Sequence, residues 1–203
     1  MALVVVQSLT NSFGEMVIAA NVILMRVDGF AMMPNFSFGN AMTTYAGQNV
    51  GAKRYDRVSQ APAGNPDRSG NFGRYHIVDS AFRKTLDVVF LQHQELVNLS
   101  YQLMMILAVG YIAMGVTQSL SGVMRGAGDT MTPMWISIVT TVIIRIPIAY
   151  GISYLTRTPE LPNGHYTCVW VSLLISWVLG ALLTTFFYRR GKWKTKAIHQ
   201  NGG

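Results

Sequence analysis

Charged residues are scarce in this chain, and their placement is uneven. Asp, Glu, Lys and Arg make up 12% of the 203 residues, against about 25% in an ordinary soluble protein. Twelve of the 25 charged residues lie between positions 53 and 95. Long stretches elsewhere are therefore almost free of charge, which excludes a fold whose whole surface faces water.

Cysteine is nearly absent, and so are the motifs of common enzymes. Cys168 stands alone, so no intrachain disulfide is possible, and we expect it to pack as a small apolar residue. No P-loop, nucleophile elbow or metal-ligand cluster is present. We expect neither an enzyme nor a metal or cofactor site. The net charge of +7 lies mainly in loops and tail, so a membrane surface rather than nucleic acid is the expected partner.

Three runs are long and apolar enough to cross a bilayer, which takes about 20 residues in a helix. Residues 96–124 and 166–188 carry no charge, and residues 131–156 carry only Arg145. The opening residues, 1–14, form an apolar run below spanning length and read as the end of a helix. With a fourth span described next, the sequence predicts an all-α polytopic membrane protein with about four spans plus a partial first helix.

The fourth span is expected in residues 15–50, although this run contains two opposite charges. Arg26 and Asp28 would lie inside or near the bilayer, where ionisable residues are costly and usually face a bundle interior. Pro34 and Gly39 are expected to break or bend the helix. A functional role and mutual neutralisation near a helix end both remain open for the charged pair.

A polar turn joins the second and third of these spans. Arg125 is expected at the C-terminal end of one helix, where a cation complements the helix dipole. Gly128 allows the chain to reverse, and Thr132 followed by Pro133 reads as the N-cap and first residue of the next helix. Two glycine pairs with a spacing of four predict close packing between helices. They are Gly47 with Gly51 and Gly122 with Gly126.

The basic residues pose a problem of parity. Residues 53–57, Arg125 and residues 189–196 are all basic and should all be cytoplasmic. Only one recognisable span, 96–124, separates the first site from the second, and one crossing cannot return the chain to the side it left. Either a span is missing within residues 58–94, which are rich in Pro, Gly and charge, or one basic site is on the wrong side. The chain divides into residues 1–57 (partial helix, bent membrane helix, basic loop), 58–94 (anomalous polar segment), 95–190 (three membrane helices) and 191–203 (basic cytoplasmic tail).

Three motifs together resemble the multidrug and toxic compound extrusion (MATE) family. They read MRVDGFAMMPNFSFGNAMTTYAGQNVGAKRYDRV, GVMRGAGDTMTP and IIRIPIAYGISYL. The resemblance covers residues 1–57 and 95–196 and favours the C-terminal half of such a transporter, whose fold it implies: twelve helices in two lobes related as parallel repeats around a central cavity. This chain would supply the end of the seventh helix and then the eighth, tenth, eleventh and twelfth. The ninth is expected where residues 58–94 stand.

The resemblance also implies a function. It implies export of amphipathic, often cationic organic compounds by alternating access, driven by an inward Na⁺ or H⁺ gradient and without another cofactor. The implied location is the bacterial inner membrane, with lipid, small organic substrates and an N-terminal lobe as partners. Two other readings stay open: a non-transporting remnant, and a flippase for lipid-linked precursors. The flippase is disfavoured because GQNVGAK and RIPIAY fit the extrusion branch better.

Site candidates follow from the same motifs. Arg26 and Asp28 match the family's Arg-x-Asp, and Arg145 matches the Arg of its RIP motif. Asp28 is a candidate for cation or proton handling, but pairing with Arg26 or Arg145 for bundle integrity is favoured. Three polar residues are cavity-lining candidates, although hydrogen bonds between helices explain them equally well. They are Asn40, Tyr45 and Gln118.

Residues 58–94 also carry a hypothesis about the gene. Their length is about that of the expected helix, while their composition changes abruptly from apolar to Pro-, Gly- and Arg-rich. Two compensating reading-frame slips would produce this combination. Translation of the codons in the other forward frames should then yield a run of about 20 mostly apolar residues.

Overall fold

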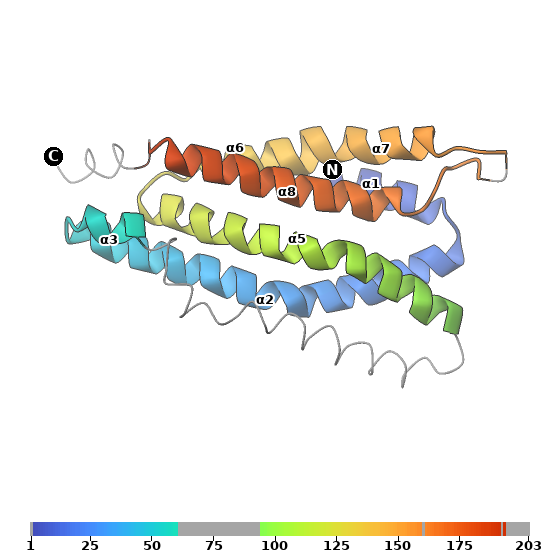
Figure 1. Cartoon of the computed structure of the whole chain (residues 1–203), viewed down its shortest axis with the longest axis horizontal. Helices are drawn as coiled ribbons and strands as arrows, with labels where there is room; N and C mark the ends of the chain where they lie inside the picture. The colour runs from blue at the N-terminus through green and yellow to red at the C-terminus, as the bar shows by residue number, and fades with distance from the viewer. Residues whose placement is uncertain (1, 61–93, 160, 192, 194–203) are drawn as a thin grey trace.

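The computed structural model describes residues 2–60, 94–159, 161–191 and 193, and every named element in them is a helix (Figure 1). The elements are α1 (Ala2–Asn11), α2 (Glu15–Gly51), α3 (Tyr55–Gln60), α5 (Gln94–Gly126), α6 (Met131–Ile138), the π-helix η2 (Val139–Ile144), α7 (Arg145–Leu155) and α8 (Cys168–Arg189). Four stretches in the described residues are long and apolar enough to span a membrane: Glu15–Gly51, Glu95–Gly126, Met131–Leu155 and Cys168–Arg189. The predicted all-α membrane fold is confirmed.

Helices α2 and α5 run in the same direction. In Figure 1 both begin at the end of the bundle where α1 turns into α2, and both finish at the end where α3 lies. The stretch from α6 to α7 returns, and α8 again runs toward the α3 end. The chain therefore leaves α3 at one end and enters α5 at the other. Residues 61–93 lie outside the described residues. They make up most of the anomalous polar segment, to which the reading-frame hypothesis applies.

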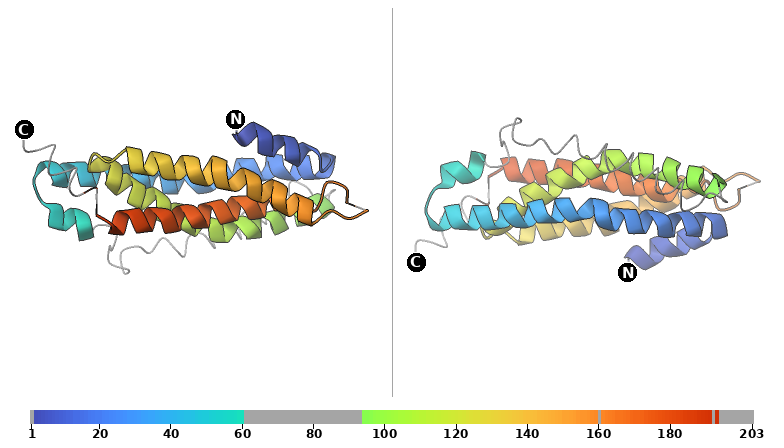
Figure 2. Two further views of the ribbon diagram at one scale, coloured as in Figure 1. Left: turned by 90° about the horizontal axis from the view of Figure 1, so that it is seen from above. Right: turned by 90° about the horizontal axis from the view of Figure 1, so that it is seen from below.

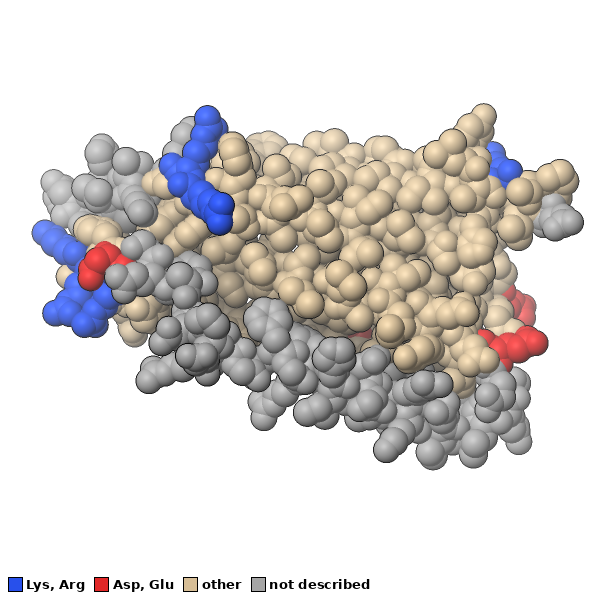
Figure 3. All heavy atoms as spheres, viewed as in Figure 1, with Lys and Arg blue, Asp and Glu red and all other residues tan. Residues whose placement is uncertain are grey.

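Charge separates along the bundle. We define the basic end as the end that carries Lys53, Arg54, Arg57, Arg125, Arg189 and Arg190. On the face shown in Figure 3, most Lys and Arg side chains gather there, and the acidic side chains lie mainly at the opposite end. Glu15 and Glu95 begin α2 and α5 at that opposite end. The described residues of all three basic sites named from the sequence therefore lie at one end, as the positive-inside argument required.

Helix α2 is continuous over 37 residues, so of the break or bend expected at Pro34 and Gly39 the break is wrong. Figure 1 shows it as a single, gently bowed rod. Pro34 removes one backbone donor inside a helix, a loss that packing against neighbouring helices tolerates in membrane spans. Gly39 lies buried against α5, where its lack of a side chain allows close packing of the two helices.

Small residues set the crossing of α2 and α5. A Cβ atom at Gly122 would collide with the backbone carbonyl of Gly39, and one at Gly126 would collide with the carbonyl of Thr43. Gly47 lies near the carbonyl of Gly126, at 3.6 Å from an added Cβ, which confirms close packing for three of the four predicted glycines. No described atom lies within 4 Å of a Cβ added at Gly51, so the described helices give no support for its predicted role in packing.

The turn between α5 and α6 uses a different cap from the expected one. α5 ends at Gly126 with Arg125 in its last turn, and Gly128 has a positive φ of 87°, as predicted. However, α6 begins at Met131, and Asp129 accepts hydrogen bonds from Thr132, 2.7 Å from its hydroxyl and 3.4 Å from its backbone N–H. The cap therefore falls on the carboxylate of Asp129, which suits a helix N-terminus better than a hydroxyl does.

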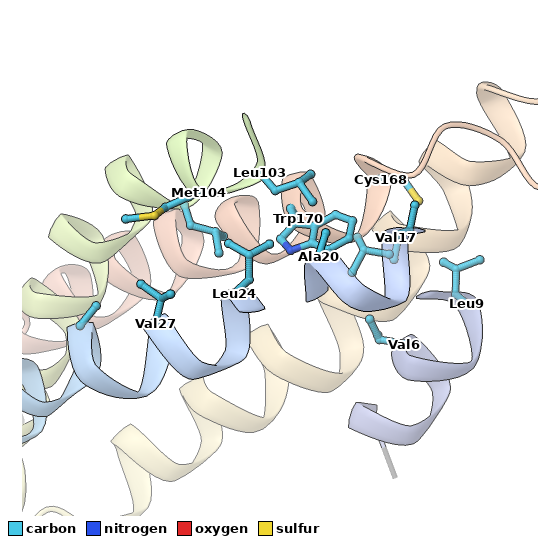
Figure 4. Close-up of a cluster of buried hydrophobic side chains, with 14 of the residues drawn as sticks. Val6, Leu9, Val17, Ala20, Leu24, Val27, Leu103, Met104, Cys168 and Trp170 are labelled. Atoms are coloured by element: carbon cyan, nitrogen blue, oxygen red, sulfur yellow. The ribbon is translucent and has the colours of Figure 1, made fainter. Parts of the chain in front are cut away.

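Two hydrophobic clusters hold the bundle together. The larger lies toward the end opposite the basic end and joins α1, α2, α5, α7 and α8 (Figure 4). Cys168 is buried in it, as predicted for a small apolar residue. α1 folds back beside the start of α2 (Figure 2). α7 contacts α1 through a hydrogen bond of 3.3 Å, which the Tyr150 hydroxyl donates to the carbonyl of Val5. The smaller cluster lies at the basic end and contains Val50, Met124 and Trp193.

Candidate functional site within the membrane spans

Three polar side chains from three spans meet inside the bundle. Asp28 on α2 is half-buried and lies within electrostatic range of Arg145 on α7. The hydroxyl of Tyr111, a buried residue of α5, approaches the Asp28 carboxylate. Tyr111 and Arg145 occupy the middle of their spans, so the cluster lies at membrane depth. We call Asp28, Tyr111 and Arg145 the charge cluster.

Several polar atoms of the charge cluster are buried without a hydrogen bond in the described chain. Oδ1 of Asp28, the hydroxyl of Tyr111 and Nε of Arg145 are buried, and none has a hydrogen-bond partner among the described residues. In a low-dielectric interior such groups feel each other's charge strongly, and each carries a desolvation penalty. The attraction between Asp28 and Arg145 is therefore not accompanied by hydrogen bonds from described residues that satisfy these three buried atoms.

A π-helix places Arg145. The backbone N–H of Arg145 donates to the carbonyl of Thr140, five residues earlier, whereas in an α-helix the acceptor would lie four residues earlier. Pro147 explains the position, because its ring would press on the carbonyl of Ile143 in a regular α-helix. Sequence reasoning missed this feature. Its signal was Pro147 two residues after Arg145, following a β-branched run, and π-helices are frequent at functional sites.

Arg26 does not belong to the charge cluster. It is exposed, whereas Asp28 faces the bundle, because residues two apart on a helix point to different faces. Of the two partners that the sequence allowed for Asp28, the structure brings Arg145 into range and leaves Arg26 outside.

The cavity-lining candidates are not brought together. Asn40 and Tyr45 are exposed on α2. Gln118 is half-buried and lines a separate cavity of about 410 Å³ between α5, α6, η2 and α8. We call this cavity the polar pocket. Tyr111, which faces Asp28, was not among the residues named from the sequence, because nothing in the uncharged run 96–124 distinguishes it from a tyrosine at a lipid interface.

Comparisons with known proteins give one family. The model of the MatE family matches residues 1–62 and 76–151. The matched residues include 58–62 and 76–94, which belong to the anomalous polar segment. Up to position 151, only residues 63–75 are unmatched. The similarity thus reaches further than the motifs in the sequence indicated.

Curated proteins with similar sequences carry a common description. A probable multidrug resistance protein of Bacillus subtilis (strain 168), YoeA, is 28% identical over 201 residues, which cover 96% of this chain and 41% of that protein. A probable multidrug resistance protein of Thermotoga maritima, NorM, is 22% identical, with 86% of this chain and 36% of that protein covered. The chain spans about two fifths of the length of these relatives.

The fold and the comparisons agree. The family match covers more than half of the chain, and the described residues form four helices apolar enough to span a membrane. Ionisable residues inside such spans are typical of transport proteins. This membrane protein belongs to the MatE family.

Proposed function

We propose that this chain forms most of one lobe of a multidrug efflux antiporter in the bacterial inner membrane. Support comes from its membership of the MatE family and from relatives described as probable multidrug resistance proteins. The proposed substrates are amphipathic, often cationic organic compounds, and the proposed coupling ion is Na⁺ or H⁺. The chain acts as part of a transporter rather than as an enzyme.

The observation that carries the proposal is the charge cluster. Asp28 on α2 and Arg145 on α7 attract each other from two different spans, each of which packs against other helices of the bundle. A proton or cation that binds Asp28 removes this attraction, and its release restores it. Ion binding thereby changes the relative stability of two arrangements of the spans, which is what coupling to alternating access requires.

The lobe is not expected to transport by itself. α2 exposes Phe30, Met33 and Phe36, which suit contact with lipid or with a second lobe but enclose no space of their own. A central cavity between two lobes needs both. The alternative is that the chain is a non-transporting remnant. In that case, co-expression of an N-terminal lobe would not restore transport.

Ethidium efflux from pump-deficient cells tests the proposal. The chain is expressed alone and together with the part of the Bacillus subtilis relative that it does not match. We expect no efflux from the chain alone and gradient-dependent efflux from the pair. Asp28→Asn should reduce that efflux at least tenfold, whereas Glu95→Gln, which removes an exposed carboxylate outside the cluster, should not. Efflux by the chain alone, or efflux from the pair that survives Asp28→Asn, overturns the proposal, and a silent pair supports the remnant.

A further inference from the structure

The polar pocket is separate from the charge cluster and has its own chemistry. It runs along α5 from Met114 to Arg125, a length of roughly 16 Å at the rise of an α-helix. Its inner wall is buried and includes Ser121, Thr140 and Ser176, while Thr141 and other residues of its outer rim are exposed. It is therefore open on one side and reaches from the basic end into the membrane.

The pocket carries charge of one sign. Arg125 is its only charged residue among those described, and no carboxylate lines it. The acid of the adjacent turn, Asp129, is not a lining residue and accepts hydrogen bonds from Thr132. A cationic ligand would meet repulsion from Arg125 with no compensating carboxylate, so the pocket suits an anion.

Of three hydroxyls in the pocket wall, only that of Ser176 is left to donate to a ligand. The hydroxyls of Thr117 and Thr140 donate within their own helices, to the carbonyls of Ala113 at 3.0 Å and Ile136 at 2.8 Å. The hydroxyl of Ser176 is buried and has no hydrogen-bond partner in the described part of the chain. A buried hydroxyl without a partner is costly, and a ligand acceptor would satisfy it.

The remaining wall is apolar and partly aromatic. Met114, Ile136 and Trp177 line it. Trp177 is half-buried, and its ring is held against Tyr111 with centroids 5.7 Å apart. A fixed indole ring offers a flat surface on which an aromatic or planar apolar group can stack.

We infer that the polar pocket is a binding site for an amphiphile with an anionic head group at Arg125 and an apolar, preferably aromatic, body beside Trp177. This chemistry differs from that of the cationic compounds proposed as exported substrates. The ligand is either a soluble organic anion or an anionic phospholipid, since both present these groups. The inference concerns binding to this chain and does not need transport to occur.

Two probes of equal size and opposite charge test the site. The purified chain, in phosphatidylcholine nanodiscs, is titrated calorimetrically with 2-naphthalenesulfonate and with trimethyl-(2-naphthyl)ammonium. We expect saturable binding of the sulfonate at least tenfold tighter than that of the ammonium. Arg125→Gln should weaken sulfonate binding about tenfold, a loss in the range of a charge-assisted hydrogen bond. Arg189→Gln, which removes another cation of the basic end outside the pocket, should leave it unchanged.

A second variant removes no polar group. A Cβ at Gly180, a lining residue, would have its nearest described neighbours, Thr117 and Thr140, at 3.9 Å, so the first atom of Gly180→Met has room and the rest of the side chain is expected to occupy the pocket. It should abolish sulfonate binding while the circular dichroism and melting temperature are retained. Equal binding of the two probes, or sulfonate binding that survives both Arg125→Gln and Gly180→Met, overturns the inference.

The last arm separates the two sources of anion. Phosphatidylglycerol is added to the nanodiscs at increasing fractions before titration. Competitive loss of sulfonate affinity assigns the site to a lipid head group, and unchanged affinity assigns it to a soluble anion. Both results require the Arg125-dependent site, and transport is measured in neither. A failure of the proposed efflux function would leave this experiment intact.

Discussion

The backbone carbonyl of Gly39 on α2 lies against Gly122 on α5, where a Cβ atom would collide with it. Both partners are backbone, so neither can rotate away. Gly122→Ala should therefore force α2 and α5 apart, and overpacking of this kind costs about 1–3 kcal/mol. The measurement is thermal unfolding of the purified protein in detergent, followed by circular dichroism.

Gly151→Ala is the matched control for that substitution. Gly151 also lies inside a helix, α7, but an added Cβ there meets no described atom within 4 Å. Removal of a helix glycine should then stabilise by roughly 0.5–1 kcal/mol. If Gly122→Ala proves as stable as Gly151→Ala, the close approach of the two helices is absent.

The second prediction concerns Asp28 and Arg145. Removal of one member of a half-buried opposite-charge pair leaves the other charge uncompensated, whereas removal of both does not. We expect Asp28→Asn and Arg145→Gln each to destabilise the protein, and the double variant to lose less than the sum. The coupling energy in a double-mutant cycle should be about 0.5–3 kcal/mol. A parallel cycle between Asp28 and Arg26 should give no coupling, because Arg26 is exposed on another face of α2. Equal coupling in the two cycles would reverse the assignment of partners.

The third prediction concerns the cap of α6. Thr132→Val removes the hydroxyl that donates to Asp129 at 2.7 Å and keeps the shape of the side chain. Loss of this bond to a charged acceptor should cost about 1.5–3 kcal/mol. Thr130→Val is the control, since Thr130 makes no side-chain capping bond in the described turn. Equal melting temperatures for the two variants would show that the bond from the Thr132 hydroxyl to Asp129 does not stabilise the start of the helix.

Much of the fold could be predicted from the sequence, because lipid imposes simple demands. Spans must be long and apolar, and their basic ends must share one side, so residues 96–124, 131–156 and 166–188 were recognisable from composition alone. The crossing missing between residues 57 and 95 followed from the same rule. The parallel directions of α2 and α5 agree with it.

Features set by contacts between distant residues were not predictable. Pro34 and Gly39 predicted a break or bend because helix propensity depends only on the local sequence. It does not include the contact between Gly39 and α5. The π-helix before Arg145 and the approach of Tyr111 to Asp28 depend on which faces of three helices meet. Gly51 has the same spacing as the packed glycines, but the described helices place no atom within 4 Å of an added Cβ there.

The relative direction of α2 and α5 decides whether the chain crosses the membrane between Gln60 and Gln94. Single cysteines at Lys53, Glu95 and Asn163, in a Cys168→Ser background, are labelled with a membrane-impermeant maleimide in right-side-out and inverted vesicles. Lys53 follows α2 at the basic end, Glu95 lies at the start of α5, and Asn163 lies in the loop before α8. We expect Lys53→Cys to react only from the cytoplasmic side, and Glu95→Cys and Asn163→Cys only from the outside. Reaction of Lys53→Cys and Glu95→Cys from the same side would show that no crossing separates them and that the parallel arrangement is wrong.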